Sequence, residues 1–138
     1  MLEKPNLQDE VIVNCLQNAY SLYVVQIAFL PLGADLHTAI YRVVTQDGWN
    51  YFVKLRSSDF NEISVELPKF LSDQGIKNVI TPLVTNAGQL WANMDPFKLI
   101  LYPFINGQDG YQIGLTQRNW RDFGIALKSI HTLLFQLR

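Results

Sequence analysis

Hydrophobic and polar residues alternate along residues 38–45 and again along residues 50–56. A period of two is typical of strands that bury one face. Asp47-Gly48 lies between the two segments and is a strong signal for a hairpin turn. The pattern therefore predicts two antiparallel strands. In the second, one face carries Phe52, Lys54 and Arg56, and the other carries Tyr51, Val53 and Leu55.

Helical spacing of apolar residues predicts three helices. The first is expected to start with Asn6 as its N-cap and to run to about Tyr20. The second covers residues 60–73, although Pro68 falls in its middle and favours a kink or a restart. The third follows Thr116, which is a good N-cap residue.

Further apolar segments bounded by turn residues predict more strands. They cover residues 21–30, 79–84, 89–94 and 97–105. Strands and helices arranged in this order predict an α+β domain with one mainly antiparallel sheet and flanking helices.

Composition narrows the class of protein. A chain of 138 residues with 49% hydrophobic and 17% charged residues suits one globular domain. The net charge of −1 gives no basic surface for nucleic acid. The longest apolar stretch, residues 22–32, is too short to span a bilayer. We therefore expect neither a nucleic acid nor a membrane as a partner. Cys15, the single cysteine, and an amino terminus without a signal-peptide pattern favour a cytoplasmic protein.

Lys54 is the main candidate for chemistry, because a lysine beside apolar residues needs water or an anion. An exposed lysine on an edge strand is the alternative. The loop at Gly33 could bring backbone N–H groups close to a phosphate. On its own the loop favours an ordinary connection, because it has a single glycine and because Asp35 would repel a phosphate unless it points away. Glu62 and Glu66 on the next helix could pair with Lys54 or simply face solvent.

Several segments in this order resemble the amino-terminal lobe of the aminoglycoside phosphotransferase family, which has a protein-kinase-like fold. They are LPLGADLHTAIYRV at 30–43, YFVKLR at 51–56, NEISVELPKFLSDQGI at 61–76, LILYPFI at 99–105 and LTQRNWRDFGIALKSIH at 115–131. The resemblance implies a five-stranded sheet in an amino-terminal lobe at 1–105. It also implies a hinge or linker at 106–115 and the first helix of a second lobe at 116–138.

The resemblance further implies a site for ATP or GTP with Mg²⁺. Its phosphate loop includes Gly33, His37 and Thr38, and Lys54 contacts the α- and β-phosphates with Glu62 as its ion-pair partner. Its hinge includes Tyr102, Phe104 and Ile105, with Phe52 and Ile105 as apolar walls. Pro68 is at home in the second helix of this family. The acceptor in the whole protein would be an aminocyclitol or a similar alcohol.

The catalytic loop of the family, of the form H-G-D-x-x-x-x-N, is absent from these 138 residues. Asp122-Phe123-Gly124 spells a kinase metal motif but lies inside the periodic final helix, where Phe123 is expected to face the core. We therefore expect no catalytic and no metal-binding residue here, and no phosphotransfer by this chain alone. The alternative is a non-catalytic binding or oligomerisation module, in which an uncovered apolar face on the final helix supports a homo-oligomer.

Overall fold

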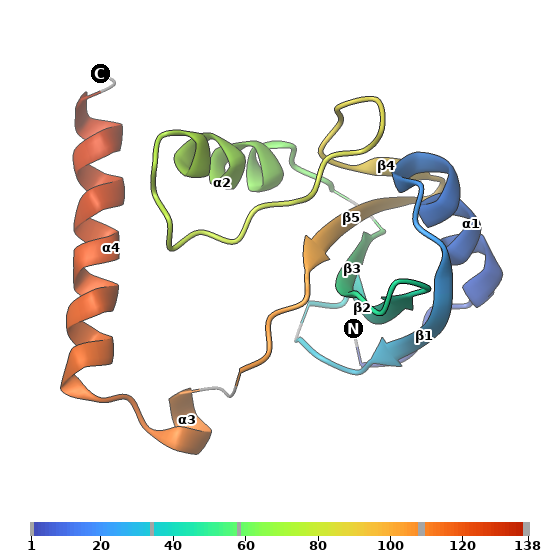
Figure 1. Cartoon of the computed structure of the whole chain (residues 1–138), viewed down its shortest axis with the longest axis horizontal. Helices are drawn as coiled ribbons and strands as arrows, with labels where there is room; N and C mark the ends of the chain where they lie inside the picture. The colour runs from blue at the N-terminus through green and yellow to red at the C-terminus, as the bar shows by residue number, and fades with distance from the viewer. Residues whose placement is uncertain (1, 34, 58, 108–109, 137–138) are drawn as a thin grey trace.

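The computed structural model describes residues 2–33, 35–57, 59–107 and 110–136. Its centre is an antiparallel five-stranded sheet with the order β1-β2-β3-β5-β4, flanked by helices (Figure 1). This confirms the predicted α+β class and the five-stranded sheet. The strands are β1 (Val24–Leu30), β2 (Thr38–Thr45), β3 (Asn50–Arg56), β4 (Ala92–Met94) and β5 (Phe97–Pro103).

The predicted hairpin joins β2 to β3. Gly48 in its turn has a φ of 84°, which suits glycine, and the Thr45 N–H donates to the Trp49 carbonyl at 2.9 Å. The register places Ile40 of β2 opposite Lys54 and Ala39 opposite Leu55. On its other side β3 pairs with β5, so β3 is the middle strand of the sheet and Lys54 does not lie on an edge strand.

The hydrophobic core lies on one face of the sheet, under helix α1 (Asp9–Tyr20). Ile12 and Leu16 of the helix pack with Val53 and Leu55 of β3, and all four side chains are fully buried. The alternation predicted for β3 is thus observed. Because the core takes the face of Val53 and Leu55, the face of Lys54 is left for other contacts.

Helix α2 (Ile63–Asp73) continues through Pro68, as the resemblance implied. Helix α3 (Gly110–Ile113) lies in the expected linker, of which residues 108–109 are outside the described residues. Helix α4 (Gln117–Gln136) follows, and residues 137–138 are again outside the described part.

Thr116 caps α4 as predicted. Its hydroxyl accepts the Asn119 N–H at 3.1 Å, and the Asn119 side chain in turn accepts the Thr116 N–H at 2.9 Å. Figure 1 shows α4 standing apart from the sheet, and none of its described residues is buried. Phe123 is therefore exposed, and its expected core-facing position is wrong.

One predicted strand is wrong, because residues 79–84 form no strand. Pro82 has no N–H to donate, and Leu83 makes a single backbone bond to Leu101 at 2.8 Å. Thr85 then turns away and donates to the Gln89 carbonyl, also at 2.8 Å. The isolated bond holds the segment beside β5 without building a ladder.

Several predicted boundaries also shift. The first helix begins at Asp9 and not after Asn6, because the Leu7 N–H bonds to the Pro5 carbonyl in a tight turn. The first strand begins at Val24 and not at 21, because Ser21 ends α1 in the left-handed region with a φ of 55°. The strands predicted at 89–94 and 97–105 shorten to β4 and β5.

None of the helices in the described part of the chain is long and apolar enough to cross a membrane.

Candidate functional site

Lys54 lies between two hollows on the face of the sheet that α1 leaves uncovered. We call them the apolar hollow, of about 370 Å³, and the polar hollow, of about 110 Å³; Lys54 and Tyr102 line both. The apolar hollow is also lined by Phe52, Ile80, Pro103 and Ile105. The polar hollow is also lined by Arg56, Asp59, Phe60, Asn61, Ser64 and Ile100.

The apolar hollow is built where β3 meets the end of β5. Phe52 and Tyr102 are register partners, and their rings meet edge to face with centroids 6.3 Å apart. Burial raises the pKa of the Tyr102 hydroxyl, so this group stays neutral at physiological pH. Ile80 and Ile105 complete apolar walls that suit a flat aromatic ring.

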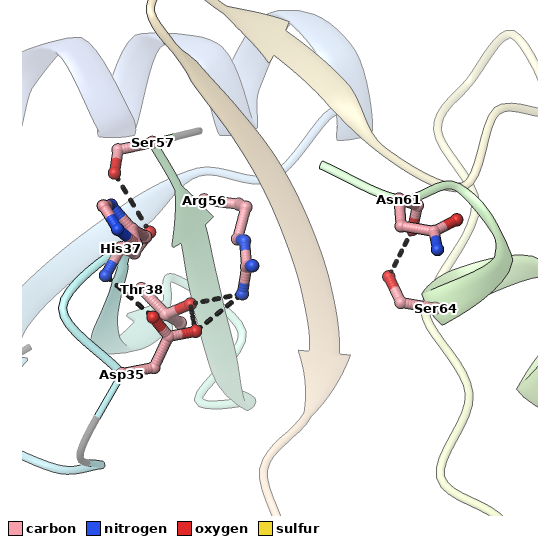
Figure 2. Close-up of polar contacts among 7 residues, drawn as sticks. All are labelled: Asp35, His37, Thr38, Arg56, Ser57, Asn61 and Ser64. Carbon is pink, nitrogen blue, oxygen red and sulfur yellow. Dashed lines mark hydrogen bonds and ion pairs between the residues drawn. The ribbon is translucent and has the colours of Figure 1, made fainter. Parts of the chain in front are cut away.

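The polar hollow is built by β3 and the start of α2. The Asn61 carboxamide oxygen accepts the Ile63 N–H at 3.0 Å, which caps the helix. The Ser64 hydroxyl donates to the Asn61 carbonyl at 2.6 Å (Figure 2). Lys54 and Arg56 bring two positive charges to this hollow, and Asp59 brings one carboxylate.

The loop before β2 is fastened to the end of β3 through Asp35. This carboxylate accepts the His37 N–H at 2.8 Å, the Thr38 hydroxyl at 2.8 Å and the Arg56 guanidinium at 2.6 Å (Figure 2). The His37 N–H, the Thr38 hydroxyl and the positive charge of Arg56 lower the pKa of Asp35. Asp35 therefore keeps its negative charge, which forms an ion pair with Arg56 within the protein.

The three residues expected in the phosphate loop lie in or next to the loop that Asp35 fastens to β3. Gly33 has a φ of 81°, a conformation that glycine adopts without strain. His37 is exposed, and its carbonyl accepts the Ser57 N–H at 2.9 Å, while Thr38 is buried and its hydroxyl also contacts Arg56 at 3.2 Å. None of the three lines either hollow, so their link to the polar hollow runs through Arg56.

The structure brings together four of the expected site residues and separates two others. Phe52, Lys54, Tyr102 and Ile105 line the apolar hollow. Glu62 is exposed at the start of α2, and within the described ranges it forms no ion pair with Lys54. Phe104 lies outside both hollows, under the Arg42 guanidinium at 4.9 Å from its ring centre.

Sequence reasoning missed Arg56, Ile80, Asn61 and Ser64 as site residues. Arg56 had a signal, since it follows Lys54 by two residues on the same strand face. Ile80 had none, because it lies in a segment that was expected to be a strand and reaches the site only through the path of the chain. Asn61 carries the ordinary signal of a helix cap.

Other parts of the described structure offer less chemistry. A hollow of about 510 Å³ between α3 and α4 is lined by Gly110, Tyr111, Leu115 and Trp120, and none of these described residues is charged. Within the described residues, no three His, Cys, Asp or Glu side chains come together in a way that could hold a metal ion.

Known proteins match this chain in structure. Spectinomycin phosphotransferase APH(9)-Ia, in complex with ADP and spectinomycin, is 30% identical with a TM-score of 0.85, over 93% of this chain and 39% of that chain. The AMP-bound complex of the same enzyme is 28% identical with a TM-score of 0.77, over 89% and 37%. No family model matches this chain, and no curated protein matches it in sequence.

Amicoumacin kinase hAmiN, in complex with AMP-PNP, Ca²⁺ and Ami, is 21% identical with a TM-score of 0.58, over 83% of this chain and 34% of that chain, and this match shows the fold alone. The two spectinomycin phosphotransferase matches confirm the resemblance to kinase-like small-molecule phosphotransferases, and the third match confirms the kinase-like fold. The chain spans less than half the length of each matched chain.

Proposed function

We propose that this chain is the nucleotide-binding lobe of a small-molecule O-phosphotransferase of the aminoglycoside or spectinomycin type. The observation that carries the proposal is the position of Lys54, at the junction of an apolar and a polar hollow. A nucleotide has the same two-part chemistry, with a flat base joined to a charged phosphate chain. The matched phosphotransferases contain ADP, AMP or AMP-PNP, which supports the same ligand class here.

In this proposal the base of ATP or GTP enters the apolar hollow. Phe52, Ile80 and Ile105 contact its faces, and the backbone of the hinge around Tyr102–Ile105 hydrogen-bonds its edge. The phosphates extend toward the polar hollow, where the Lys54 ammonium offsets their charge. Within the described residues Lys54 has no ion-pair partner, so its charge is available to an anion.

Mg²⁺ is commonly held by one or two carboxylates together with substrate phosphates. Asp59 is the one carboxylate that lines the polar hollow in the described part of the chain. A single carboxylate does not make a metal site by itself, so the proposal gives this lobe the nucleotide and leaves the metal to the phosphates and to groups outside these residues. The acceptor would be an aminocyclitol or a similar alcohol bound by the whole protein.

Titration with Mg·ATP and Mg·GTP tests the proposal. Lys54→Ala should weaken binding by about tenfold or more, because a charge-assisted hydrogen bond to phosphate is worth about 1.5–3 kcal/mol. Lys128→Ala is the matched control, since Lys128 is exposed on α4 and lines neither hollow. Equal binding by both variants, or no binding of either nucleotide by the unchanged chain, would overturn the proposal.

The same proposal expects no phosphotransfer by the 138 residues alone, because the groups that orient an acceptor hydroxyl are not among them. Transfer of phosphate from ATP to spectinomycin by the purified chain would contradict this part.

One observation favours a second candidate, a non-catalytic module that assembles through α4. Trp120, Phe123 and Leu127 are exposed on this helix together with Phe135, and large exposed apolar patches mark interaction surfaces. A stable dimer in light scattering, combined with no thermal shift from either nucleotide, would favour this candidate over the first.

A further inference from the structure

Three side chains on one face of β3 follow one another toward the loop end of the strand. Phe52, Lys54 and Arg56 each lie two residues apart, which is about 6.6 Å per step along a strand. Of the two hollows, Phe52 lines only the apolar one and Arg56 lines only the polar one, whereas Lys54 lines both. If the base lies against Phe52, the phosphate farthest from the base lies at the level of Arg56.

The Arg56 guanidinium is held in place before any ligand arrives. Its Nη1 donates to the Asp35 carboxylate at 2.6 Å and to the Thr38 hydroxyl at 3.2 Å, and its side chain is 29% exposed (Figure 2). A guanidinium has five N–H donors in a fixed planar fork, so one group can contact the loop and a phosphate together. Fixing the fork in advance also lowers the entropy cost of binding.

We propose that Arg56 is a second phosphate-binding cation, which contacts the terminal phosphate of a bound nucleoside triphosphate while Asp35 and Thr38 position it. This rests on the proposed nucleotide-binding function and adds a specific role within that site, the choice between nucleotides by phosphate number. Lys54 contributes to binding of all phosphorylated forms, whereas Arg56 favours the triphosphate over the monophosphate.

The test measures dissociation constants of adenosine, AMP, ADP and ATP with Mg²⁺ by calorimetry, or of the guanosine series if that is the one bound. Arg56→Ala should lower the preference for ATP over AMP by about tenfold and leave adenosine affinity unchanged, because it removes the terminal phosphate contact and leaves the lining of the apolar hollow intact. Arg42→Ala is the matched control. Arg42 lies on the same sheet face, opposite Phe52, and bonds to Asn50 outside both hollows.

If the contact between Arg56 and Asp35 only held the loop in place, changing either residue would lower the ATP preference by the same amount. Asp35→Asn separates the two roles, since the amide still offers an oxygen to the His37 N–H but removes a negative charge beside the phosphates. The ATP preference should therefore fall less in Asp35→Asn, which keeps an oxygen that can position Arg56, than in Arg56→Ala, which removes the cation. A fall of the same size in both variants would overturn the proposal.

Arg56→Lys guards against misfolding of the alanine variant. The lysine keeps a positive charge but cannot contact Asp35, Thr38 and a phosphate at once. The ATP preference of Arg56→Lys should therefore lie between that of Arg56→Ala and that of the unchanged chain. If Lys54→Ala weakens ATP binding while Arg56→Ala keeps the full ATP preference, the role of Arg56 is refuted and the proposed function stands. If the unchanged chain binds no nucleotide, both fail.

Discussion

Leu55→Ala tests whether β3 separates a structural face from a ligand face. Leu55 is 0% exposed, and it lies beside Ala39 of β2 and Leu99 of β5 in the sheet register. Its neighbour Lys54 lies on the opposite face and lines both hollows. Truncating Leu55 should therefore weaken the fold without touching the site.

The magnitude follows from burial. Leucine to alanine removes roughly three carbon groups, each worth about 0.8 kcal/mol of burial, which gives about 2.4 kcal/mol. The cavity left behind adds about 24 cal/mol for each Å³ that the neighbours do not fill, and measured substitutions of this kind span about 2–5 kcal/mol. We expect the free energy of unfolding to fall by about 3 kcal/mol.

Urea unfolding followed by circular dichroism measures this change. With a slope of roughly 2 kcal/mol per molar urea, the midpoint should fall by about 1.5 M. Leu127→Ala on α4 is the matched control, because Leu127 is 40% exposed and α4 buries none of its described residues. The control should change stability by less than about 0.5 kcal/mol.

Two results would refute the reasoning. A loss below about 1 kcal/mol for Leu55→Ala would mean that this face of β3 is not the core, since buried leucines cost more than that. An equal loss for Leu127→Ala would mean that α4 packs into the same cooperative unit. The ATP affinity of the folded Leu55→Ala chain should match that of the unchanged chain.

Tyr41→Phe should leave the free energy of unfolding unchanged or raise it by up to about 1 kcal/mol, because the buried Tyr41 hydroxyl has no hydrogen-bond partner among the described residues. Burial, and to a smaller extent the charge of Asp9, raises the pKa of Tyr41 from near 10 to about 12. The free energy of unfolding should therefore fall as pH rises through this range. Tyr41→Phe should reduce that fall when thermal unfolding is measured at alkaline pH. Gly33 has a φ of 81°, so Gly33→Ala should lower the free energy of unfolding by about 1–2 kcal/mol in urea. It should also weaken the affinity for ATP more than that for adenosine, and equal effects on both ligands would contradict a phosphate loop. Phe123→Glu should shift any self-associated chain toward the monomer in sedimentation, because Phe123 is exposed on α4, whereas a concentration-independent monomer before the substitution would rule out this surface.

The sequence by itself determined the parts of the fold that depend on neighbouring residues. The turn at Asp47-Gly48 and the alternation through Lys54 predicted the hairpin and the two faces of β3, because side-chain direction in a strand follows from position alone. The cap at Thr116 was predicted for the same local reason. The ordered segments of the resemblance carried the lobe and four residues of the apolar hollow.

Tertiary structure decided the contacts between residues that are distant along the chain. Arg56 meets Asp35 across 21 positions, and nothing local marks the two as partners. Ile80 reaches the apolar hollow because Pro82 interrupts the ladder that its segment would otherwise form. Glu62 lines neither hollow and forms no ion pair with Lys54 within the described residues, although the resemblance implied a pair. The side chain that α2 brings to the polar hollow is that of Ser64. A local pattern fixes the face on which a side chain lies, whereas packing of the whole chain selects what it meets there.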